Sequence, residues 1–101
     1  MSKKTYEEHL REDWRLLMLR ILSEQNGYSC NNSIIQAAMS RMGVVISGDH
    51  VISNAAWLRE QLLITISEPV PGVEVYTLTK RGQEVAEGTS TVPGVSRTSP
   101  R

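Results

Sequence analysis

Three residues near the middle of the chain, Ser47, Asp49 and His50, are of the types that form a hydrolytic triad. Nucleophilic catalysis requires such groups to converge in space beside a site that stabilises an oxyanion. Neighbours in sequence around the start of a helix do not converge in that way. The sequence therefore predicts that the protein is not an enzyme.

The residues that could bind metal or carry out redox chemistry are few. Cys30 is the single cysteine, and His9 and His50 are the two histidines. One cysteine cannot form an internal disulfide, and these three residues do not have the spacing of a metal-ligand set. We expect no metal, no cofactor and an inert thiol at Cys30.

A third chemistry, the reading of base edges, fits the polar face of a helix predicted over residues 48–61. Its outward stripe comprises His50, Ser53, Asn54, Trp57 and Gln61. Polar side chains of these types donate and accept hydrogen bonds in the major groove, and we predict that the stripe binds duplex DNA. An ordinary solvated helix face is the alternative. For Trp57, packing beneath a β-hairpin or against the first helix is the favoured alternative.

Two basic residues, Lys80 and Arg81, follow the second predicted strand and are candidates for contacts with backbone phosphates. Two solvated charges at the start of a helix are the competing interpretation. The charge balance weighs against a strong DNA interaction, since eleven Lys and Arg offset eleven Asp and Glu and the predicted hairpin carries Glu68 and Glu74.

The first element that positions these residues is a helix predicted from Thr5 to about Glu24, since Tyr6, Leu10, Trp14, Leu17 and Ile21 form one apolar stripe. Its second half is also apolar on the other sides, at Leu16, Leu19 and Leu22. Either a second chain or the C-terminal segment must cover that surplus. We predict a homodimer with these three leucines at the interface.

The remaining pattern predicts two more helices, a hairpin and a short last helix. Asn31 or Asn32 caps the second helix, Gly43 ends it, and a brief extended piece covers residues 44–46. Ser47 caps the third helix, in which five residues face inward: Val51, Ile52, Ala55, Leu58 and Leu62. Two β-rich runs, 63–68 and 73–78, flank a Pro-Gly turn, and Thr79 caps a helix that Gly88 ends.

This order predicts an α+β winged helix-turn-helix with a three-helix core, a two-stranded wing and a short C-terminal helix. Residues 1–88 form the domain. Residues 89–101, rich in Ser, Thr, Pro and Gly, are expected to be an extended and flexible tail.

The sequence Leu78-Thr79-Lys80-Arg81-Gly82 resembles the Leu-Thr-x-x-Gly that follows the wing in MarR-like and ArsR-like bacterial regulators. In that motif we expect Leu78 to enter the core, Thr79 to cap the next helix and Gly82 to permit close packing.

Nearly the whole chain resembles a family of small winged-helix proteins of Mu-like phages and prophages. The match rests on Trp57-Leu58 with Leu63, and on the run from Leu78 through Val85-Ala86-x-Gly88 to Val92-Pro93-Gly94-Val95-x-Arg97, while Thr98 stands where that family has Pro. The resemblance implies a phage or prophage regulator.

We therefore predict a regulator that binds double-stranded DNA in the cytoplasm of a bacterial host, with no membrane contact, because no apolar run is long enough to span a bilayer. The alternative is a winged helix used only for protein contacts, in a phage transcription, replication or assembly complex. A ligand-responsive regulator has no supporting residue cluster.

Overall fold

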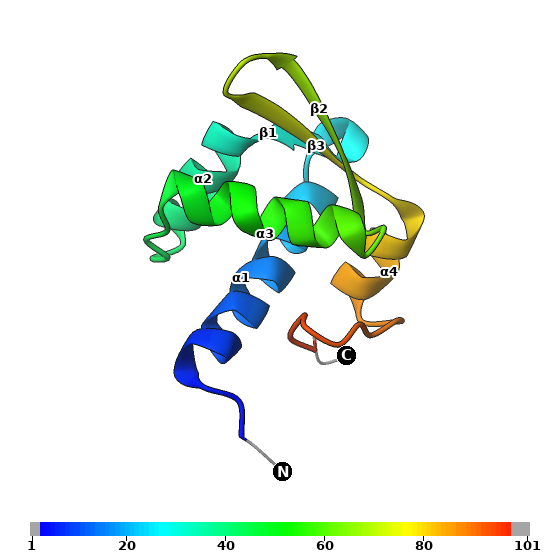
Figure 1. Cartoon of the computed structure of the whole chain (residues 1–101). Coiled ribbons are helices and arrows are strands. Elements are labelled where there is room, and N and C mark those ends of the chain that lie inside the picture. The colour runs from blue at the N-terminus through cyan, green and yellow to red at the C-terminus, as the bar shows by residue number, and fades with distance from the viewer. Residues whose placement is uncertain (1–2, 98–101) are drawn as a thin grey trace.

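The arrangement of helices and strands follows from the computed structural model, which describes residues 3–97. The chain forms α1 (Tyr6–Ser23), a short 3-10 turn η1 (Asn26–Tyr28), β1 (Ser29–Asn31), α2 (Asn32–Arg41), α3 (Gly48–Glu60), β2 (Ile64–Val70), β3 (Val73–Leu78) and α4 (Lys80–Glu87) (Figure 1). The three longer helices share one core, and the β2–β3 hairpin rises beside α3 as a wing. The fold is the predicted α+β winged helix-turn-helix.

The helices begin where side chains satisfy their free backbone N–H groups. The hydroxyl of Thr5 accepts a hydrogen bond from the Glu8 amide, and the Glu8 carboxylate accepts one from the Thr5 amide, which makes a capping box and lowers the pKa of Glu8. Asn31, the first of the two candidates, caps α2. Ser47 and Thr79 cap α3 and α4, as predicted.

The motif after the wing also behaves as predicted. Leu78 is buried, and the Thr79 hydroxyl donates to the backbone oxygens of Leu62 and Leu63. A Cβ placed on Gly82 would collide with the backbone oxygen of Leu63, so α4 approaches the start of β2 as closely as only glycine allows.

The sheet has three antiparallel strands in the order β1-β3-β2. In β2–β3, Ile64 pairs with Leu78, and in β1–β3, Cys30 pairs with Tyr76. The predicted two-stranded wing is formed by β2 and β3, and β1, which the sequence did not predict, adds a third strand to the sheet. A strand as short as β1 has no alternating pattern that the sequence could reveal. The extended piece predicted at residues 44–46 is not part of the sheet.

The core of the chain contains the three leucines that were predicted to lie between two copies. Leu19 and Leu22 are fully buried, Leu16 is nearly so, and α4 packs along α1. That prediction was wrong, because the C-terminal segment covers the apolar surplus of α1 within one chain.

The described part of the segment after α4 is packed against the domain, unlike the extended tail that we predicted. Val92 and Val95 are buried in the core cluster, and the Ser96 amide donates a hydrogen bond to the Glu12 backbone oxygen at 3.2 Å. Two isolated valines give no periodic signal, so only the fold shows where they lie. The remainder of the predicted tail, from Thr98 to Arg101, lies outside the described residues.

Candidate nucleic-acid interface

The most exposed line of α3 differs from the stripe that the sequence predicted. The buried side of α3 comprises Val51, Asn54, Ala55 and Leu58. At 100° per residue, the line opposite these residues comprises Asp49, Ser53, Ala56 and Glu60. Ala56 is half-buried and the other three are exposed, as is Arg59 beside the line. Of the predicted stripe, only Ser53 belongs to this line. Leu62, predicted to face inward, has a positive φ of 63° and is 68% exposed, because it turns the chain from α3 into β2.

Asn54 is a structural residue in this fold. It is 3% exposed, its Nδ2 donates to the His50 backbone oxygen at 2.8 Å, and its Oδ1 accepts from Arg15 Nε at 2.9 Å. Because this side chain is buried, with both polar atoms hydrogen-bonded inside the chain, it cannot reach a base edge. The prediction that Asn54 reads DNA was wrong, since α1 lies along that side of α3.

Trp57 is half-buried and packs against α1 and the C-terminal segment. Arg15 Cζ lies 4.0 Å from the centroid of its indole ring, and Gly94 lies so close to the other atoms of the ring that a Cβ there would collide with it. Packing against the first helix, one of the alternatives for this residue, is what the structure shows.

Arg15 joins three segments that are distant in sequence. Its Nη1 donates to the Gly94 backbone oxygen at 2.9 Å, in addition to the bond to Asn54 and the contact with Trp57. Burial lowers the pKa of the Arg15 guanidinium from its usual value. We call Arg15, Asn54, Trp57 and Gly94 the Arg15 clamp; it fixes the rotation of α3 relative to α1.

The other predicted site residues remain on the surface to different degrees. His50 is exposed, and its ring lies beside Trp14 with the centroids 5.3 Å apart. Gln61 is half-buried at the end of α3, whereas Ser53, Lys80 and Arg81 are exposed. The structure thus brings His50, Asn54 and Trp57 together on the α1 side of α3. The predicted stripe did not include Asp49, Ala56, Arg59 or Glu60, because the sequence pattern alone did not show exactly which side of α3 is buried.

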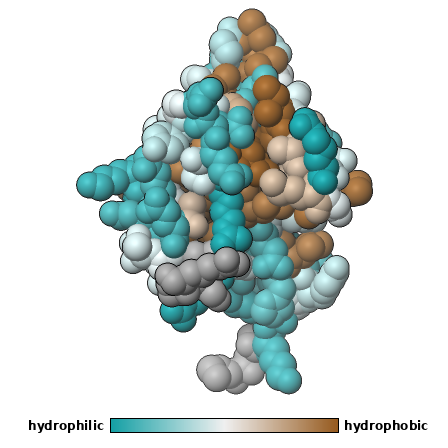
Figure 2. All heavy atoms as spheres, turned by 180° about the vertical axis from the view of Figure 1, so that it is seen from behind, coloured by the Kyte–Doolittle hydropathy of each residue, from teal (hydrophilic) through white to brown (hydrophobic). Residues whose placement is uncertain are grey.

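The wing is held against the start of α2. Asn32 Nδ2 donates to the Gly72 backbone oxygen, Asn32 Oδ1 accepts from the Glu74 amide, and the Gly72 amide donates to Glu68 Oε2 at 3.2 Å. Viewed from behind, the wing end of the molecule shows hydrophobic side chains (Figure 2), and Val70 is 53% exposed. The hairpin from Ile64 to Leu78 contains no Lys or Arg.

Residues 3–97 contain little that would support metal binding or thiol chemistry. In that part of the chain, no three side chains of His, Cys, Asp or Glu are grouped so as to hold a metal ion. Cys30 is half-buried, and burial raises the pKa of its thiol, which disfavours the reactive thiolate. None of the helices in residues 3–97 combines the length and apolarity that crossing a membrane requires.

Comparison by sequence finds relatives among phage and bacterial proteins. The uncharacterized protein gp26 of Escherichia phage Mu is 46% identical over 92 residues, which cover 91% of this chain and 94% of gp26. An uncharacterized protein of Haemophilus influenzae is 40% identical over 77 residues, covering 76% of this chain and 74% of that protein. No model of a protein family matches the sequence.

Comparison by structure finds RosR of H. salinarum. The match has a TM-score of 0.63 and 19% identity, and covers 72% of this chain and 64% of RosR, so the chain spans less than two thirds of RosR. The complex structure of RosR-S1 matches with a TM-score of 0.64 and 17% identity, over 79% of this chain and 70% of that chain. At this identity the likeness shows a shared fold.

Proposed function

Since the chain belongs to the family of phage Mu gp26, we propose that it is a phage or prophage regulator that binds duplex DNA through the outer line of α3. The observation that carries this proposal is the placement of α3: its outer line, centred on Ser53, faces solvent beside the wing. Helix-turn-helix proteins insert a helix exposed in this way into the major groove.

The side chains on the outer line have the chemistry for direct readout. Carboxylates of Asp49 and Glu60 can accept a hydrogen bond from cytosine N4, and the Ser53 hydroxyl can donate or accept. The methyl group of Ala56 suits contact with a thymine methyl. Arg59, Lys80 and Arg81 are the exposed cations that can reach phosphates. Because the cations are few, we expect a modest dependence of affinity on salt.

The test is fluorescence anisotropy of the full chain with duplex fragments of the phage genome at several salt concentrations. Ser53→Ala should weaken binding to the preferred site about tenfold relative to random DNA, as loss of one base contact does. Arg59→Ala should weaken binding to all sequences and reduce the salt slope by about one. Arg20→Ala, which removes the same charge from the last turn of α1, should leave both unchanged. No binding at low salt would refute the proposal.

A second candidate, a winged helix that contacts only protein, is favoured by the chemistry of the wing. A wing that lies on phosphates normally presents cations, whereas here the tip presents Glu68 and the half-exposed Val70. Val70→Lys distinguishes the two roles. If DNA runs beside the wing, this variant should bind DNA more tightly with a salt slope increased by about one. Thr91→Lys, at an exposed position after α4, should have neither effect.

A further inference from the structure

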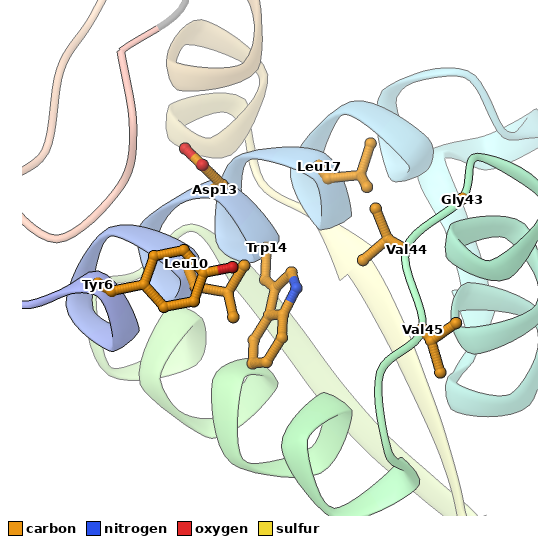
Figure 3. Close-up of a pocket in the computed structure, with 8 residues that line it drawn as sticks. All are labelled: Tyr6, Leu10, Asp13, Trp14, Leu17, Gly43, Val44 and Val45. Atoms are coloured by element: carbon orange, nitrogen blue, oxygen red, sulfur yellow. The ribbon is translucent and has the colours of Figure 1, made fainter.

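One side of α1 carries an apolar surface that the described chain covers only in part: Trp14, Leu17 and Val44 also pack against the core, whereas Tyr6 and Val45 are exposed. Tyr6, Leu10, Trp14 and Leu17 follow one another along α1, and Val44 and Val45 of the loop between α2 and α3 complete the lining of a hollow (Figure 3). Tyr6 is 76% exposed and Val45 is 89% exposed. We call these six residues the α1 patch.

The position of the patch explains why part of it is exposed. Leu16, Leu19 and Leu22 of α1 are buried in the core, whereas the N-terminal turns of α1 project beyond the rest of the molecule (Figure 1). The apolar stripe nevertheless continues along these projecting turns to Tyr6. An aromatic side chain exposed to this extent leaves well over 100 Å² in contact with water, and an exposed apolar surface rimmed by polar residues marks an interaction site.

We propose that the occupant of the α1 patch is a second copy of this chain, with the two α1 helices antiparallel about a two-fold axis. Tyr6 of each copy then packs against the partner's Leu17 and the partner's Val44, while Leu10 faces the partner's Trp14. Leu17 follows Tyr6 by eleven positions, which is a rise of about 16 Å along the helix. A two-fold interface requires one surface that complements itself. In the α1 patch the exposed Tyr6 forms one end of the hollow, and Leu17 and Val44 form the other.

The charges beside the patch fit the same register. His9 and Asp13 are both exposed and lie one helical turn apart on one edge of the stripe. Asp13 Oδ1 accepts a hydrogen bond from Ser96 within the chain, which leaves Oδ2 for a partner. Antiparallel pairing about a two-fold axis brings equivalent edges together, so His9 lies near the partner's Asp13, and the symmetry makes this contact twice. A carboxylate and an imidazole that lie side by side attract each other or form a hydrogen bond. This pairing favours a second copy over an unrelated apolar surface as the occupant of the patch.

The size of the patch sets the expected strength of the dimer. Three turns of one helix and a short loop lie at or below the low end of stable interfaces, which is about 1,200 Å² of total buried surface. We therefore expect a dissociation constant in the micromolar range. The dimer does not depend on DNA binding, so its test and the test of the proposed function fail separately.

Sedimentation equilibrium of the full chain across micromolar concentrations tests the dimer. The unsubstituted chain should dimerise, and Tyr6→Glu should stay monomeric, because a charge on this side chain cannot enter the partner's hollow. Tyr6 is largely exposed, so this variant retains its fold, which circular dichroism checks. Tyr28→Glu, at another exposed tyrosine, should dimerise normally. A monomer at all concentrations, or a Tyr6→Glu dimer, would overturn the proposal.

Disulfide cross-linking tests the register. In a Cys30→Ser background, Tyr6→Cys and Leu17→Cys together place two thiols about 16 Å apart on one helix, too far for a bond within a chain because bridged Cα atoms lie within about 7 Å. Oxidation should give covalent dimers of the double variant. Tyr6→Cys alone should give none, since the two Tyr6 positions lie at opposite ends of the interface. Equal cross-linking of both variants, or of neither, contradicts the register.

Discussion

The guanidinium of Arg15 lies over the indole of Trp57, with Cζ 4.0 Å from the ring centroid. The same guanidinium donates to Asn54 Oδ1 and to the Gly94 backbone oxygen, both at 2.9 Å. One side chain of α1 thereby orients α3 and holds the C-terminal segment. The face that α3 offers to a partner depends on these contacts, although none of the four residues belongs to the outer line.

The first prediction concerns the Arg15 clamp. Arg15→Gln should lower the free energy of unfolding by about 3 kcal/mol, because it removes the cation over Trp57 and disrupts two charge-assisted hydrogen bonds. Arg15→Lys should recover only part of the loss, since one ammonium cannot reproduce the planar fork. Urea denaturation measures both. A loss below about 0.5 kcal/mol for Arg15→Gln, the range of ordinary surface substitutions, would show that the clamp does not stabilise the fold.

The second prediction concerns Gly94, which has a φ of 98° and lies against Trp57. Gly94→Ala adds a methyl group that must collide with the ring, and it also strains the backbone. Gly72→Ala is the matched control, because Gly72 has a φ of 83° with open space around it. Gly94→Ala should therefore destabilise the fold by about 1 kcal/mol or more beyond Gly72→Ala. If both variants lose the same stability in thermal denaturation, the segment after α4 does not pack tightly against Trp57.

The third prediction separates two neighbouring residues of α3. Asn54→Ala should destabilise the protein by about 2 kcal/mol, because Arg15 Nε and the His50 backbone oxygen both lose a partner in a buried setting. Ser53→Ala, on the exposed line, should change stability by less than about 0.5 kcal/mol. Chemical denaturation of the two variants side by side makes the comparison. Similar effects of both substitutions would contradict the rotation of α3 described above.

The fourth prediction concerns Tyr76, which is fully buried and donates a hydrogen bond to Glu74 Oε1 at 2.8 Å. Burial, and then the hydrogen bond to Glu74, raise the pKa of Tyr76 above its ordinary value of 10.0. A folded-state pKa above the unfolded one gives stability that is complete below about pH 10 and is lost as the pH rises beyond it. Unfolding measured from about pH 8 to about pH 11 should show this decline.

The control for that prediction is Tyr76→Phe. It should cost about 1–2 kcal/mol at neutral pH, because Glu74 loses its donor, but it should reduce the decline at high pH. All other residues are the same in both proteins, so the difference between the two profiles reports Tyr76. Profiles that fall in parallel would show that the buried hydroxyl does not govern alkaline stability.

The local features of this protein were determined by the sequence itself. The caps at Thr5, Ser47 and Thr79, the turn at Gly72 and the close approach at Gly82 each depend on residues a few positions apart or on one glycine's lack of a Cβ. Such interactions act within a turn of the chain, so their patterns are legible without the fold. Element order and the winged-helix class followed from them.

Tertiary packing alone decided which surfaces are buried. Leu19 entered the core because α4 lies along α1, Asn54 became a structural residue because Arg15 of a distant helix reaches it, and Val95 became a core residue because the chain turns back after α4. A helical stripe shows which residues lie on one side of a helix, but contacts between segments far apart in sequence determine which segment covers that side. For that reason only the three-dimensional structure showed which line of α3 faces outward, and that the apolar stripe of α1 stays partly exposed beside Val44 and Val45.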